Sequence, residues 1–126
     1  MPIPKAFMFY APVVKALIDG NIHSIDEIKK SVAENMRLST NSLEELLPSG
    51  RDTVFNYRLK VALQDLVKKG AFVEKESRDH YKLTEAGMRL TSDPNAIESN
   101  SIRLQILLKE QKRLGDKIRE IVSDVK

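Results

Sequence analysis

The chain has 126 residues, no cysteine, no tryptophan and a formal net charge of +3. This length suits one domain with a short appendage, which excludes a Rossmann enzyme, a TIM barrel and a complete α/β nuclease of usual size. Without cysteine there is no disulfide framework and no thiolate metal site, and the two histidines, His23 and His80, lack ligand-like spacing. We therefore expect no metal, no cofactor and no catalysis by this chain.

No segment has the character of a membrane span or a signal peptide. The longest apolar stretch near the start, residues 7–18, is interrupted by Pro12 and Lys15. It falls far short of the roughly 20 residues that cross a bilayer, and it lacks a basic leader and a cleavage site. The sequence predicts a cytoplasmic protein with no membrane partner.

Positive charge is concentrated in the middle of the chain. Residues 50–90 hold nine basic and six acidic groups, net +3, whereas residues 1–49 carry net −1 and residues 91–126 net +1. An excess of this size fits an ordinary solvated surface as well as an electrostatic footprint for nucleic acid. The distribution alone leaves these two interpretations equal.

Hydrophobic periodicity and capping signals predict helices in the first part of the chain. The first runs over residues 6–19. Ile22 and His23 are expected to form a short extended link, and a capping box at Ser24–Glu27 then starts a second helix, which ends at about Asn35. A second capping box at Ser42–Glu45 predicts a short helical turn that ends at Leu47.

The strongest helical signal covers residues 53–69, where Lys68 and Lys69 place positive charge at the carboxyl end of the helix and Gly70 at the C′ position ends it. Its apolar face is formed by Phe55, Leu59, Ala62, Leu63 and Leu66. The pattern then changes to a β-hairpin, with strands at 71–74 and 80–83 and a charged tip between them. Thr84 is expected to cap another short helix.

The last segment, about residues 95–125, is predicted to form one long helix. Its apolar residues recur alternately three and four apart, as a heptad seam does, with Asn100 and Gln111 as polar seam positions. A seam outside an already complete domain needs a partner surface. We expect homodimerisation through Leu104, Leu107, Gln111, Leu114, Ile118, Ile121 and Val125. The alternative is a helix that folds back onto its own domain, and the orientation of a pair stays open.

The order of these elements is typical of a winged helix-turn-helix. We therefore predict a mainly α (α+β) fold with a winged-helix DNA-binding domain over residues 1–92 and a two-stranded wing. Residues 93–126 form the long C-terminal helix, a dimerisation coiled coil. The helix over residues 53–69 becomes the recognition helix, and the hairpin becomes the wing.

The outer face of the predicted recognition helix carries polar side chains. At roughly 100° per residue, four of them lie about 140–200° around the helix from Phe55, and Asn56 lies nearer the edge. The four are Thr53, Tyr57, Lys60 and Gln64. Such a stripe suits a helix that enters a major groove, although every amphipathic helix has a polar outer face. Arg58 lies nearer the core, where we expect it to pair with an acid such as Glu45.

Charged residues on both sides of this helix are further candidates for DNA contacts. Arg51 precedes the helix, where backbone amides and a guanidinium suit a phosphate. Lys75 and Arg78 in the wing suit phosphates or the minor groove, whereas Glu76 and Asp79 oppose a strong grip.

Several phrases resemble the N-terminal domain of Mrr-type restriction proteins. The resemblance covers most of residues 7–90, and the phrase Leu46-Leu47-Pro48-Ser49-Gly50 before the long helix is its most specific part. The other phrases are residues 10–20, 55–62, 66–70 and 81–87. The resemblance implies a winged-helix module that binds double-stranded DNA and delivers a nuclease domain or subunit to it.

The sequence departs from such proteins after Pro94. No Asp followed by Glu-x-Lys on a strand is present, and Glu110-Gln111-Lys112 lies inside the heptad helix. The chain is therefore either a freestanding binding module or a fragment cut before a nuclease. A dimeric winged-helix transcriptional repressor and a winged-helix protein-interaction module are the alternative functions.

Overall fold

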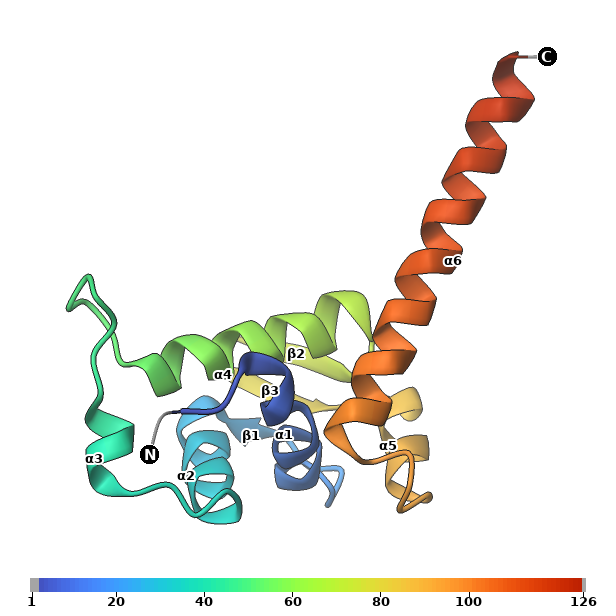
Figure 1. The fold of residues 1–126 in the computed structure, drawn as a ribbon. Helices are drawn as coiled ribbons and strands as arrows, with labels where there is room; N and C mark the ends of the chain where they lie inside the picture. Colours follow the sequence, from blue (N-terminus) through green and yellow to red (C-terminus); the bar gives the residue numbers. More distant parts are fainter. Residues whose placement is uncertain (1–2, 126) are drawn as a thin grey trace.

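The fold is an α+β arrangement in which helices pack around a small antiparallel sheet (Figure 1). The computed structural model describes residues 3–125, without the side chains of residues 113 and 116–125. The first elements are η1 (Ala6–Phe9), α1 (Tyr10–Ala16), β1 (His23–Ser24), α2 (Ile25–Asn35) and α3 (Thr40–Glu44). They are followed by α4 (Val54–Gln64), its π-helical continuation η2 (Asp65–Lys69), β2 (Val73–Ser77), β3 (His80–Leu83), α5 (Glu85–Thr91) and α6 (Ser99–Val125).

The first two predicted helices are confirmed. The first is divided into the 3₁₀ turn η1 and the helix α1, and Pro12 lies in the first turn of α1, where a missing N–H costs no intrahelical bond. Gly20, with φ +79°, turns the chain after it. The capping box forms as expected, since the Ser24 hydroxyl accepts a hydrogen bond from the Glu27 amide at 3.2 Å.

The prediction for the next short helix is wrong in its position. The capping residue is Ser39, whose hydroxyl accepts from the Ser42 amide at 3.1 Å. Ser42, predicted as the cap, is buried inside α3, and the helix ends at Glu44 rather than Leu47. Two serines three residues apart offer the same local chemistry, and burial of the second selects the first.

The core is built by the apolar face of α4 against η1 and α1. All five side chains predicted for this face are buried. Phe55 meets Phe9 edge to face, with ring centroids 5.9 Å apart. The Tyr10 hydroxyl donates to Asp65 Oδ2 at 2.6 Å, and its pKa lies well above the usual range because of burial and then this hydrogen bond.

Arg58 is structural, as expected, but its partner differs from the predicted Glu45. Its guanidinium donates to the carbonyls of Ile3 and Pro4. The half-buried arginine therefore ties the N-terminal segment to α4. Ile3 is buried as part of the core.

The end of the long helix differs from the prediction. Gly70 has φ −92°, and the left-handed residue is Ala71, with φ +56°. Gly70 is required for space instead, because a Cβ there would lie 2.7 Å from a ring carbon of Phe72 and 3.2 Å from Ile106. The glycine thus permits close approach of three segments rather than a left-handed turn.

The predicted hairpin is confirmed and belongs to a three-stranded sheet of order β1-β3-β2. The third strand, β1, was predicted only as an extended link, and it pairs His23 with Tyr81. β2 continues to Ser77, so the turn is shorter than predicted and Asp79 takes φ +61°. The Asp79 carbonyl accepts from the Ile25 amide at 2.8 Å, which fixes the hairpin tip to the start of α2.

The first turns of α6 pack on η1 and α1, and the rest of the helix extends away from the body (Figure 1). The buried Ser99 hydroxyl accepts from the Ala11 amide at 3.0 Å and donates to the Met8 carbonyl at 3.1 Å. Ile102 and Ile106 are also buried. The helix therefore does fold onto its own domain, through residues outside the predicted seam.

Gly87 allows α5 to lie against the chain at Phe72. A Cβ at this position would stand 2.1 Å from the Phe72 carbonyl oxygen. We expect Gly87→Ala to lower the free energy of unfolding by more than about 2 kcal/mol in urea titrations, because backbone must move. Arg89→Ala, which removes an exposed ion pair in the same helix, is the control and should cost about 0.5 kcal/mol or less. Equal effects would contradict the steric account.

His23 lies between two carboxylates. Its ring nitrogens are 2.8 Å from Glu27 Oε2 and 2.9 Å from Asp19 Oδ2, and these hydrogen bonds, Glu27 first, raise the His23 pKa. The hydrogen bond with His23 lowers the pKa of Glu27, whereas the pKa of Asp19 is lowered first by the Asn21 amide and then by His23.

A raised His23 pKa means that protonation stabilises the fold. This contribution is complete below the ordinary histidine pKa of about 6.5 and is lost as pH rises through the raised value. We expect the free energy of unfolding to fall as the pH rises from about 5.5 to about 8.5. The fall should be larger in the native chain than in His23→Gln, with a difference below about 1 kcal/mol. Parallel pH profiles for the two chains would contradict this role.

Candidate functional site

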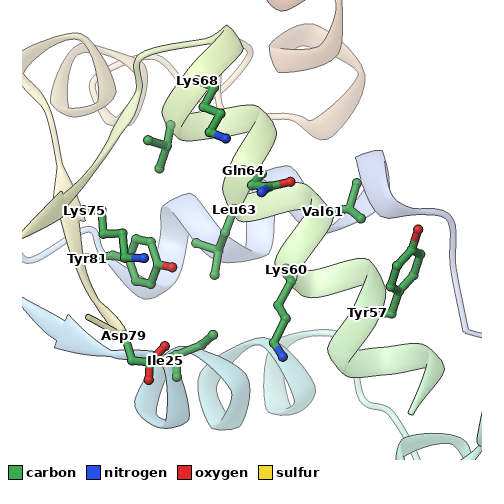
Figure 2. Close-up of a pocket in the computed structure, with 11 residues that line it drawn as sticks. Ile25, Tyr57, Lys60, Val61, Leu63, Gln64, Lys68, Lys75, Asp79 and Tyr81 are labelled. Atoms are coloured by element: carbon green, nitrogen blue, oxygen red, sulfur yellow. The ribbon is translucent and has the colours of Figure 1, made fainter. Parts of the chain in front are cut away.

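A groove of about 470 Å³ lies between the outward face of α4 and the β-hairpin (Figure 2). Three of the predicted residues on α4, namely Tyr57, Lys60 and Gln64, line it, and all three are exposed. They lie on the opposite side of α4 from the buried apolar face. Lys68, one turn beyond Gln64, continues the row.

The opposite wall of the groove comes from the hairpin and the start of α2. Lys75 on β2 and Tyr81 on β3 face α4, together with Asp79 from the turn (Figure 2). Ile25 contributes an apolar surface. The lining thus contains three lysine ammonium groups and one carboxylate, a net charge of +2 in a half-open groove.

A second hollow continues from this groove around the hairpin tip. Lys60 and Asp79 line both hollows. Here Lys60 is joined by Arg78 from the turn and Lys29 from α2, and the carboxylate of Asp79 is joined by that of Asp26. Because the Asp79 carbonyl holds the tip against α2, these cations come from three elements in a fixed arrangement.

Lys60 is available to an external partner. Its Nζ lies 3.9 Å from Asp52 Oδ2, and its side chain is 58% exposed. An exposed ion pair at this distance contributes little, so an anion that approaches the groove can compete for the ammonium group. The pKa of Asp52 is lowered mainly by the hydrogen bond from the Asn56 side chain, then by the Thr53 amide.

Thr53 and Asn56 lie apart from the groove. The Thr53 hydroxyl accepts from the Asn56 amide at 3.1 Å, and the Asn56 side chain donates to Asp52 Oδ1 at 3.1 Å. Both residues line a different hollow, between α2, α3 and α4. Arg51 is exposed in the preceding loop and does not line the groove. The structure thus places the predicted residues Arg51, Thr53 and Asn56 at or just before the start of α4, where Thr53 is the N-cap.

Three groove or tip residues were not predicted. Lys68 lies at about 220° from Phe55, on the same polar face, but was interpreted only as a charge at the helix end. Tyr81 lies in a segment with strand periodicity, and this local pattern does not indicate that the strand lies opposite α4. Lys29 belongs to a different helix, so only the tertiary packing brings it to the tip.

The chemistry available here is recognition through hydrogen bonds and charge. Among the residues that the structure describes, no group of three or more His, Cys, Asp or Glu is placed to hold a metal ion. No helix in the described part is long and apolar enough to cross a membrane. The groove offers ammonium, amide and phenol groups, which suit a polyanion with exposed hydrogen-bonding edges.

The fold and the groove define a small α+β domain with a groove of net positive charge. The chain belongs to the Mrr N-terminal domain family, whose sequence model matches residues 8–93. This confirms the resemblance found in the sequence, and it associates the domain with restriction systems. Searches of curated proteins and of solved structures gave no match.

Proposed function

We propose that this chain is a winged-helix module that binds duplex DNA for a restriction-type system and has no catalytic activity of its own. The groove between α4 and the hairpin carries the proposal, because its charge and hydrogen-bonding groups lie on the one face of α4 that the core leaves free. In this proposal α4 enters the major groove, and the hairpin is the wing.

The order of elements supports the proposal. A helix, a short strand, three helices and a hairpin follow one another, and the long helix α4 is the last of the three, directly before the hairpin. The sheet order β1-β3-β2 places the first strand against the returning strand of the hairpin. This topology holds the hairpin beside α4, so that both reach one duplex.

The groups on the two walls suit different parts of DNA. Gln64 and Tyr57 present an amide and a phenol, which suit the edges of bases in the major groove. Lys60, Lys68 and Lys75 present ammonium groups, which suit phosphates. The tip cations Lys29 and Arg78 extend this charge to a neighbouring stretch of backbone.

Charge reversal in the groove is the direct test. We expect Lys60→Glu to weaken binding of a duplex at low salt by more than about tenfold, because it replaces a phosphate contact with repulsion. Lys15→Glu makes the same charge change on α1, at an exposed position that does not line the groove. Fluorescence anisotropy would measure both, with circular dichroism as the check on folding. Equal losses in the two variants would contradict groove binding.

Asp79 allows a test in the opposite direction. Asp79→Asn removes the one carboxylate of the groove lining and leaves a side chain that tolerates the positive φ. We expect affinity for duplex DNA to rise by about two- to fivefold at low salt and the gain to shrink as salt is added. An unchanged or lower affinity would favour a protein partner at this surface instead.

A further inference from the structure

The free part of α6 presents a row of exposed leucines. Leu104, Leu107, Leu108 and Leu114 are 57%, 50%, 55% and 61% exposed. We call these four residues the leucine face. Leucine on a helix that extends away from the body is costly to leave in water, and exposed apolar side chains gathered on one helix face are typical of an interaction site.

The leucine face points away from the domain. At roughly 100° per residue, the docking residues Ser99, Ile102 and Ile106 fall within about 60° of one another, whereas the four leucines lie about 120–240° around from Ile102. The body of the domain therefore leaves this face open. A second helix can reach it without displacing any docking contact.

Several contacts hold α6 in this rotation. The Lys109 ammonium donates to the Gly70 carbonyl at 2.6 Å and lies 4.2 Å from the centre of the Phe72 ring. Arg103 stacks over Phe7 at 4.3 Å. Turning the helix to bury the leucines would break all three contacts and expose the docking isoleucines.

We propose that the leucine face packs against α6 of a second copy of this chain, with the two helices antiparallel. The inference concerns assembly and stands independently of DNA binding. The heptad phase of the leucine face continues in the sequence to positions 118, 121 and 125, whose side chains lie outside the described residues. A period of this kind over about four repeats is what a helix needs to pair with its own copy.

Charge complementarity favours the antiparallel orientation. The flanking heptad positions 103, 110, 117 and 124 alternate in sign, as Arg, Glu, Lys and Asp. In an antiparallel coiled coil, the positions that flank the seam on one side face the same set of positions on the second helix. With the two-fold axis midway between residues 111 and 114, position 110 faces position 117 of the copy and position 103 faces position 124. Each pair brings opposite charges near each other, while the Arg103 guanidinium stays over Phe7 and the Glu110 carboxylate stays beside Lys69.

The other flank is complementary in size. The same register sets Leu108 beside Gly115 of the copy, and a Cβ on Gly115 would have nothing within 4 Å in the isolated chain. Glycine within a helix costs about 1 kcal/mol relative to alanine. Space for a large side chain from the second copy gives this glycine a function. A parallel pair would instead set the charged flank opposite Leu108 and Gly115, with no ion pairs.

The molar mass in solution tests the pairing. Sedimentation equilibrium should give twice the chain mass of 14.3 kDa for the native protein. Leu107→Glu with Leu114→Glu should give the mass of one chain, because both carboxylates would fall in the interface. Leu46→Glu, at a leucine that is 59% exposed outside α6, is the control and should stay paired. A native chain that is monomeric at concentrations up to about 100 μM would overturn the proposal.

Engineered cysteines test the orientation, since the native chain has none. Antiparallel helices separate the two copies of position 100 by about 25 residues, or about 37 Å. Asn100→Cys should therefore give no disulfide with itself, whereas a mixture of Asn100→Cys and Val125→Cys chains should cross-link on oxidation. Rapid cross-linking of Asn100→Cys alone would show a parallel pair and contradict the antiparallel one.

Discussion

Burial of one face of α4 is the constraint on which the structure depends. Phe55, Leu59, Leu63 and Leu66 leave water together against η1 and α1, and each large side chain in such a core contributes about 2–5 kcal/mol relative to alanine. This packing fixes the rotation of α4. The polar face must then point outward, and the hairpin that follows closes one side of it to form the groove.

The junction at Gly70 links the groove between α4 and the hairpin to the helix α6, which carries the leucine face. Here the end of α4–η2 meets the hairpin through Phe72 and meets α6 through Ile106 and Lys109. Lys69 reaches Asp65 at 3.7 Å and Glu110 at 3.6 Å, so charge also connects the helices. A pair of chains joined through α6 would therefore hold each α4 in a defined position relative to the pair.

The sequence predicted most of the fold because periodicity and capping are local signals. The helix α4, the hairpin and the caps at Ser24 and Thr84 are confirmed. Features that depend on distant partners were missed: a two-residue strand has no measurable period, so β1 appeared only as a link. Local patterns were enough to select Tyr57, Lys60, Gln64 and Lys75 in the groove, whereas Tyr81 and Lys29 needed the tertiary structure. The residues by which α6 docks onto the domain were not predicted, because the heptad pattern is the stronger signal in the sequence of this helix.

The proposed function requires that the exposed face of α4 and the hairpin form one surface for duplex DNA. Titration of an isotope-labelled chain with a short duplex, followed by NMR through its backbone amides, tests this most directly. We expect shift changes concentrated at Tyr57, Lys60 and Gln64 on α4 and at Lys75 on β2, with α5 unaffected. Changes centred on α5 or α1, or none at a duplex concentration of about 1 mM, would contradict it.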